Sequence, residues 1–222
     1  MNKKIILIAV LIISIVVLSS CKADTIDITS YDNRQASLVD GFIYMNDTYC
    51  IDGQTVFIGD SITEFYPVDE FFKGIEGEVY NRGISGDTSN RMKLRIASTA
   101  LSINPRNLII NIGINDLNCG FLPQSIADNI EECITLALAN NAEVNLILVS
   151  VYPFTKELKD KIQATNTLIQ ALATEYGVTY VNVFDDLADS DGAMPLVYAY
   201  DNLHPSMAGY EIITNKIKPF IV

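Results

Sequence analysis

The stretch Thr55-Val56-Phe57-Ile58-Gly59-Asp60-Ser61 decides the fold of this 222-residue chain. Its first four residues form a short apolar run, which is typical of a strand that is covered on both faces. Gly59, Asp60 and Ser61 follow at once, and residues of these types favour a sharp turn out of a strand. The stretch therefore predicts a buried strand that ends at a polar corner.

Further apolar runs continue this pattern, and amphipathic stretches separate them. We expect strands at residues 55–58, 78–81, 107–112, 144–151 and 178–183. We expect helices from residue 87 or 88 to about 100, and at 123–140, 155–176 and 205–218. In the first of these helices, Met92, Leu94 and Ile96 are the expected apolar side, and Arg91, Lys93 and Arg95 the polar side. The alternation predicts a three-layer α/β/α sandwich around a central five-stranded parallel sheet, in which ligands bind at the carboxyl ends of the strands.

The first 21 residues predict a signal peptide rather than a part of this fold. Lys3 and Lys4 precede an uncharged apolar stretch at 5–18, which is too short to span a bilayer as a mature helix. Leu18-Ser19-Ser20-Cys21 resembles a bacterial lipobox, in which the cysteine is lipidated and becomes the new N-terminus. The alternative is an ordinary signal anchor with an incidental cysteine. The lipobox predicts a protein of the cell envelope, anchored to the membrane through Cys21 and facing outward.

Charge and cysteine content exclude several classes of function. The net charge is −12, and removal of Lys3 and Lys4 with the signal peptide would make it −14. With no basic tract, an acidic chain of this kind is not expected to bind nucleic acid. A single histidine and the lack of Cys-x-x-Cys spacing predict no metal site. Cys50, Cys119 and Cys133 allow at most one disulfide, and we expect buried, inert thiols.

The one histidine of the chain is the candidate catalytic base. It lies in Asp201-Asn202-Leu203-His204-Pro205, near the C-terminus. The Asp201 carboxylate can accept a hydrogen bond from Nδ1–H and leave Nε2 free as a base. A serine hydroxyl is a poor nucleophile without such a base. If the two ends of the chain meet, Ser61 and His204 predict a serine hydrolase, although Gly-x-Ser-x-Gly does not occur.

Two loops offer donors for the oxyanion that forms during acyl transfer. Gly83 can expose its backbone N–H in the segment 81–87, and the side-chain amide of Asn115 follows the strand at 107–112. The plainer alternative is that Gly83 and Gly86 only shape a turn and that Asn115 only caps one.

Four blocks in this order resemble the SGNH subgroup of the GDSL esterase/lipase family, whose fold is flavodoxin-like. They are Gly-Asp-Ser-Ile-Thr-Glu from residue 59, Asn-Arg-Gly-Ile-Ser-Gly-Asp-Thr from 81, Gly-Ile-Asn-Asp from 113 and Asp-Asn-Leu-His-Pro from 201. The resemblance covers residues 55–222. Residues 22–54 would be an N-terminal extension, with a helix at 31–42 like the leading helix of many bacterial members. Asn202 departs from the pattern, because many relatives carry glycine there.

The resemblance implies a role for each block. Ser61 would be the nucleophile, His204 the base and Asp201 the residue that orients the imidazole. The Ser61 N–H, the Gly83 N–H and the Asn115 side chain would form the oxyanion hole, and no cofactor is implied. Asp60 and Asp116 would stabilise loops, and Arg82 and Asp87 would form a supporting ion pair.

The second and third blocks look closest to the platelet-activating-factor acetylhydrolase-like branch and its bacterial carbohydrate-acetylesterase relatives. That likeness predicts an esterase that removes acetyl groups from a glycan or from a small ester substrate. The lack of a long apolar insertion favours a short acyl group. A lysophospholipase or thioesterase for longer chains is the alternative. A surface glycan-binding module without turnover is a third interpretation. The oligomeric state stays open.

Overall fold

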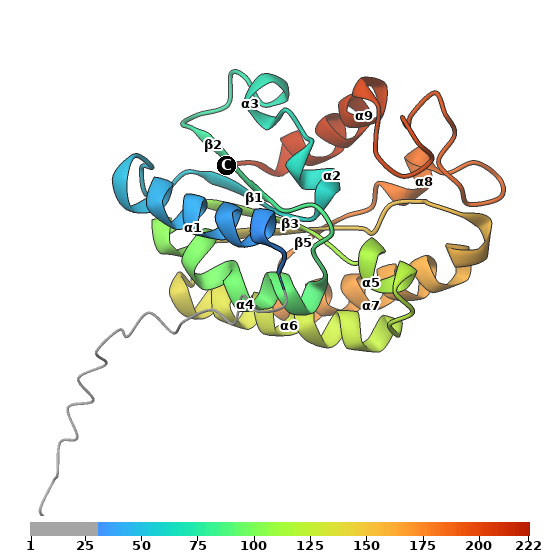
Figure 1. The fold of residues 1–222 in the computed structure, drawn as a ribbon, viewed down its shortest axis with the longest axis horizontal. Coiled ribbons are helices and arrows are strands. Elements are labelled where there is room, and N and C mark those ends of the chain that lie inside the picture. The colour runs from blue at the N-terminus through green and yellow to red at the C-terminus, as the bar shows by residue number, and fades with distance from the viewer. Residues whose placement is uncertain (1–30) are drawn as a thin grey trace, which may run out of the picture.

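The computed structural model describes residues 31–222. Five parallel strands form one sheet in the order β2-β1-β3-β4-β5, and helices cover both of its faces (Figure 1). This confirms the predicted three-layer α/β/α fold. The strands are β1 (Thr55–Gly59), β2 (Val79–Gly83), β3 (Asn107–Asn111), β4 (Asn145–Val149) and β5 (Thr179–Val181). The α-helices are α1 (Asn33–Thr48), α2 (Ser61–Glu64), α3 (Val68–Phe71), α4 (Ser89–Thr99), α5 (Ile114–Asn118), α6 (Pro123–Asn140), α7 (Lys159–Tyr176), α8 (Phe184–Leu187) and α9 (Met207–Ile217). Short 3₁₀ helices are η2 (Leu101–Ile103), η3 (Lys156–Leu158) and η4 (Lys218–Phe220).

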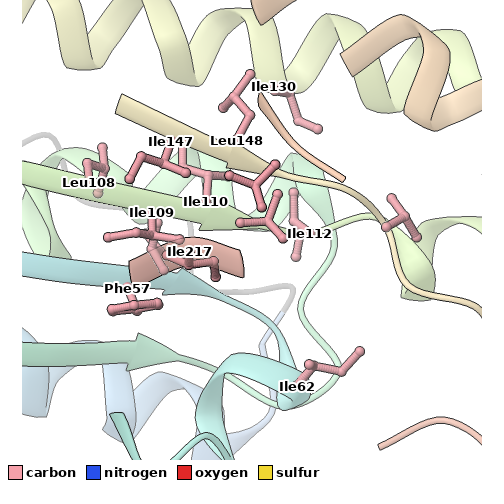
Figure 2. Packing of buried hydrophobic residues seen from close by; sticks show 14 of the residues in the cluster. Phe57, Ile62, Leu108, Ile109, Ile110, Ile112, Ile130, Ile147, Leu148 and Ile217 are labelled. Atoms are coloured by element: carbon pink, nitrogen blue, oxygen red, sulfur yellow. The ribbon is translucent and has the colours of Figure 1, made fainter. Parts of the chain in front are cut away.

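The two helical layers differ in size. Helices α1, α4, α6 and α7 contact one another in series on one side of the sheet, and α3, α8 and α9 lie on the other (Figure 1). Between them, the strands bury apolar side chains on both faces. Figure 2 shows strand residues such as Ile109 and Leu148 between Ile130 of α6 and Ile217 of α9. Burial of each such side chain contributes roughly 1.5–3 kcal/mol, so the central strands account for much of the stability.

Strands β2, β1 and β3 end at the same level of the sheet. Gly59 is paired with Gly83 of β2 and with Asn111 of β3. A Cβ atom on Gly59 would lie 2.1 Å from the Asn111 carbonyl oxygen, so only glycine fits where β1 ends. The loops that follow these three strands therefore leave the sheet side by side, at one edge.

Most expected elements are present with shifted ends. The helix expected at 155–176 is divided into η3 and α7, and the last helix begins at Met207 because Ser206 is its N-cap. The short helices α2, α3, α5 and α8 were not predicted. The helix expected at 31–42 extends to Thr48 and lies along edge strand β2, where Phe42 packs 5.1 Å from the Arg82 guanidinium. The predicted signal peptide and Cys21 lie outside the described residues.

Candidate active site

Ser61 begins helix α2 immediately after β1. Asp60 caps this helix, since its Oδ1 accepts a hydrogen bond from the Ile62 N–H at 2.9 Å. The Tyr210 hydroxyl of α9 donates to the Ile62 carbonyl at 2.8 Å and ties the same turn to α9. The serine is thus fixed by contacts on both sides, and it keeps 6 % of its surface exposed.

The two ends of the chain meet at this serine. His204 Nε2 lies 2.9 Å from Ser61 Oγ, and His204 Nδ1 lies 2.8 Å from Asp201 Oδ2. A carboxylate can only accept, so Nδ1 carries the proton and Nε2 is left to accept the hydrogen of the serine hydroxyl. The structure therefore brings Ser61, His204 and Asp201 into the order that a nucleophile, a base and an orienting carboxylate require.

The segment that carries Asp201 and His204 is held by its own backbone. Asp201 Oδ1 accepts from the N–H groups of Leu203 and His204, and the Tyr200 N–H donates to the His204 carbonyl at 2.8 Å. These bonds to His204 lower the pKa of Asp201, so its carboxylate stays ionised near neutral pH. Asn202 adopts a left-handed backbone with φ 68°, which asparagine tolerates better than most residues. Its departure from the glycine of many relatives therefore leaves the turn intact.

Of the three donors expected for the oxyanion hole, two are available and one is not. The Ser61 N–H has no hydrogen-bond partner among the described residues, as suits the first position of a helix. Asn115 Nδ2 donates one hydrogen to the Asp87 carbonyl at 2.9 Å and retains a second. The Gly83 N–H instead donates to Asn81 Oδ1 at 2.8 Å. Gly83 is also buried against α2, because a Cβ there would lie 2.1 Å from the Glu64 nitrogen. Its expected role as a donor is thus corrected to one of close packing.

Gly86 has the exposure that Gly83 lacks. It is exposed, with a left-handed backbone at φ 78°, and within residues 31–222 its N–H has no hydrogen-bond partner. Its neighbour Ser85 is bonded to Glu64 of the serine helix, and its neighbour Asp87 to Asn115. The loop that carries Gly86 is therefore bonded both to the helix of Ser61 and to the side chain of Asn115. The Ser-Gly-Asp order was visible in the sequence, but nothing there distinguished Gly86 from Gly83.

The supporting ion pair has a different partner from the one expected. Asp87 pairs with Arg95 at 2.8 Å, and both side chains are fully buried, whereas Arg82 bonds to Asn46 and to the Thr99 carbonyl. Arg95 also donates to the carbonyl oxygens of Gly59 and Arg82, where β1 and β2 end. Burial raises the pKa of Asp87, and the Arg95 charge holds that rise back. This pair fixes the strand ends from which the site loops depart.

Two further buried carboxyl groups stabilise the loops, as expected. Asp116 of α5 accepts from the N–H and hydroxyl of Ser89 and thereby caps α4, and burial raises its pKa. Asp60 is more enclosed. Its Oδ2 has no hydrogen-bond partner among the described residues, and burial raises its pKa to about 7.

Exposed apolar side chains lie beside His204 and in the segment that leads to it. Phe65, at the end of α2, contacts the His204 ring with centroids 5.2 Å apart and is 51 % exposed. Leu196, Val197 and Tyr200, in the segment leading to His204, are exposed as well. Two hollows of about 270 and 320 Å³ lie elsewhere, the first between α7 and α8 and the second on α6.

Cys50, Cys119 and Cys133 form no disulfide. Cys133 is buried and Cys50 half-buried, but Cys119 is exposed, so the expectation of buried thiols is wrong for that residue. From Tyr31 to Val222, no helix has the length and apolar character needed to cross a bilayer.

The comparisons with known proteins point in one direction. The sequence model of the GDSL-like lipase/acylhydrolase family matches residues 57–212. No curated protein matches the chain significantly. Among solved structures, a candidate platelet activating factor from Streptococcus pneumonia is 27 % identical, with a TM-score of 0.78 over 85 % of this chain and 92 % of that one.

Two Bacteroides structures are similarly close. A GDSL-like lipase from Bacteroides thetaiotaomicron is 29 % identical, with a TM-score of 0.74 over 82 % of this chain and 96 % of its own. A candidate acylhydrolase from Bacteroides fragilis is 26 % identical, with a TM-score of 0.74 over 82 % and 94 %.

Proposed function

The chain belongs to the GDSL-like lipase/acylhydrolase family and is a serine ester hydrolase, and on that premise we propose that it removes short acyl groups, acetyl above all, from a glycan or another small alcohol. The contact that carries the proposal is the 2.9 Å separation of Ser61 Oγ and His204 Nε2. In a surface module that only binds glycans, nothing would require this contact.

In the proposed reaction, Ser61 Oγ attacks the ester carbonyl while His204 Nε2 takes the hydroxyl proton. Asp201 stabilises the imidazolium that results. The imidazolium then gives its proton to the leaving alcohol, and an acyl group remains on Ser61. Water attacks this second ester with His204 again as the base, and the acid leaves.

The proposed oxyanion hole consists of the Ser61 N–H, the Gly86 N–H and the free hydrogen of Asn115 Nδ2. All three belong to segments at the carboxyl ends of β1, β2 and β3. Each donor of this kind lowers the barrier by about 3–4 kcal/mol, because it meets charge that develops only in the transition state. No metal ion or organic cofactor has a part in these steps.

Short connections favour a short acyl group. Only Asp60 separates β1 from α2, and only Ile112 and Gly113 separate β3 from α5. Such loops are too short to fold over the serine as a lid or to build a long acyl tunnel. The long connection between α8 and α9 carries Asp201 and His204 itself.

The alternative is an acylhydrolase for longer chains, such as a lysophospholipase or thioesterase. The observation that favours it is a set of exposed apolar side chains beside His204 and in the segment before it, namely Phe65, Leu196, Val197 and Tyr200. An alkyl chain that packed on these side chains would be partly removed from water.

Nitrophenyl esters from acetyl to dodecanoyl test both substrates. We expect the highest kcat/KM with acetyl, and an optimum at about eight carbons or more would replace the acetylesterase proposal by the alternative. Ser61→Ala should lower the rate by several orders of magnitude, whereas Ser125→Ala, on the exposed side of α6, should not change it. Equal rates for wild type and Ser61→Ala would refute the enzymatic mechanism. Acetate release from defined acetylated glycans would then identify the alcohol.

We also propose that the protein is a lipoprotein of the cell envelope, attached through Cys21 and facing outward. The support is the lipobox-like Leu18-Ser19-Ser20-Cys21 after an apolar stretch. Cys21→Ser should move the protein from the membrane fraction to the soluble fraction or block its processing. Normal processing together with unchanged membrane association would contradict the lipid anchor.

A further inference from the structure

The first turn of α1 contacts the oxyanion loop, which we define as residues 84–87. Gln35 Nε2 donates to the Ser85 carbonyl at 2.7 Å, and the Tyr31 hydroxyl donates to Asp87 Oδ1 at 3.0 Å. Arg34 pairs with Glu64 of the serine helix, and Glu64 Oε2 accepts from the Ser85 N–H at 2.5 Å. Tyr31, just before α1, and Gln35, in its first turn, thus bond to the two neighbours of Gly86.

The Gln35 side chain is fixed more firmly than a surface amide. It is 7 % exposed, and its Oε1 accepts from the Asp32 N–H at 3.1 Å and from Arg91 Nη2 at 2.6 Å. Two donors on Oε1 fix which end of the amide is oxygen, so Nε2 must face the Ser85 carbonyl. The direction of this hydrogen bond is therefore set by the charge and backbone around it.

That hydrogen bond fixes the direction of the Gly86 N–H. The peptide unit between Ser85 and Gly86 is planar and trans, so its carbonyl oxygen and its amide hydrogen point in opposite directions. Because Gln35 holds the oxygen on the side of α1, the hydrogen is aimed away from α1. Glycine at φ 78° has little intrinsic resistance to rotation of this peptide, so an external contact must hold it.

We propose that Gln35 is a positioning residue of the esterase, and that its amide locks the peptide plane that supplies the second oxyanion donor. This inference rests on the proposed function, since the Gly86 N–H matters only if an oxyanion forms beside Ser61. It assigns the N-terminal helix a part in catalysis in addition to covering β2.

Gln35→Glu tests the proposal, because glutamate keeps the acceptor for Arg91 and loses the donor to Ser85. We expect kcat for nitrophenyl acetate to fall about 10- to 100-fold, below the full loss that follows removal of an oxyanion donor. KM should change by less than about twofold, because the donor acts in the transition state. Gln35→Met, which removes both polar atoms at similar length, should give the same loss if Gln35→Glu folds poorly.

Asn46→Asp is the matched control. Asn46 is a buried amide on the same helix, and its Nδ2 donates to the Thr99 carbonyl at 3.1 Å, at the far end from the oxyanion loop. This variant should lower the melting temperature at least as much as Gln35→Glu and leave kcat of the folded enzyme unchanged. Equal losses of kcat in both variants would indicate that α1 acts only through stability, and would overturn the proposal.

Amide hydrogen exchange gives a second measurement that needs no activity. The Asp87 N–H donates to the Ile84 carbonyl at 3.0 Å and closes the oxyanion loop, so its exchange reports opening of that loop. Gln35→Glu should accelerate this exchange about tenfold or more, and Asn46→Asp should not. Unchanged exchange would refute the inference even in an inactive protein. If Gln35→Glu exchanged faster but the wild-type protein hydrolysed no ester, the proposed function would be refuted, and the contact between Gln35 and the loop would stand.

Discussion

Asp60→Asn is expected to stabilise the protein above neutral pH, which is unusual for a change beside a nucleophile. The Asp60 carboxyl is 1 % exposed, and its Oδ2 has no hydrogen-bond partner among the described residues. Burial raises its pKa from the ordinary value of 3.8 to about 7, and the charges of Asp87 and Asp116 add to the rise. The folded state therefore holds this proton at a pH where the unfolded chain has released it.

The sign and size of the effect follow from this difference. Between about pH 4 and 7 the folded state binds more protons than the unfolded state, so this group makes the free energy of unfolding fall as pH rises. A rise of the pKa from 3.8 to about 7 corresponds to about 4 kcal/mol in total. Between pH 5 and 8 the loss amounts to about 2.5 kcal/mol. Asparagine carries no charge, and its oxygen can still accept from the Ile62 N–H that Asp60 accepts from.

Urea unfolding at pH 5, 6, 7 and 8 measures the prediction. The free energy of unfolding of Asp60→Asn, relative to wild type, should increase by about 2.5 kcal/mol across this series. Asp69→Asn, at an exposed position of α3, should show no such increase. A difference between Asp60→Asn and wild type that stays constant from pH 5 to 8 would refute the raised pKa of Asp60.

Two other substitutions test the support and the chemistry of the site. Arg95→Met leaves the buried Asp87 carboxylate without its partner and should lower the free energy of unfolding by about 3–5 kcal/mol. Lys93→Met breaks a partly exposed pair on the same helix and should lower it by about 1 kcal/mol or less. Denaturant unfolding measures both variants, and equal losses would contradict this prediction. Asn115→Ala should lower kcat about 100- to 1000-fold with the melting temperature nearly unchanged, and Asn182→Ala, an exposed amide bonded to Asp185, should keep full activity. A kcat for Asn115→Ala within about threefold of wild type would remove that amide from the oxyanion hole.

The sequence predicted the sheet well because its strands are buried on both faces and read as continuous apolar runs. It also predicted that Ser61 and His204 would meet, and the two side chains lie 2.9 Å apart. It failed where a residue's environment comes from distant segments. Arg95 was assigned to the polar side of an amphipathic helix, yet it is fully buried on the strand ends. Gly83 was selected as a donor because glycine can expose its N–H at the end of a strand. The bond from that N–H to Asn81 cannot be seen in a linear pattern.

The four unpredicted short helices have a common cause. Each has four or five residues and follows a strand or a tight turn. Periodicity cannot reveal a single turn of helix, because too few residues repeat. Helix α2 forms because Asp60 caps it and Tyr210 of α9 holds its carbonyl, and α9 comes about 145 residues later in the chain.

The contact between Ser61 and His204 has a consequence for the protein before it has folded. Ser61 precedes its base by 143 residues, and the helix that braces its first turn through Tyr210 follows later still. A growing or truncated polypeptide would therefore have no competent serine. Hydrolysis would begin only once α9 has docked against the turn that carries Ser61, so the order of segments along the chain delays activity until folding has brought them together.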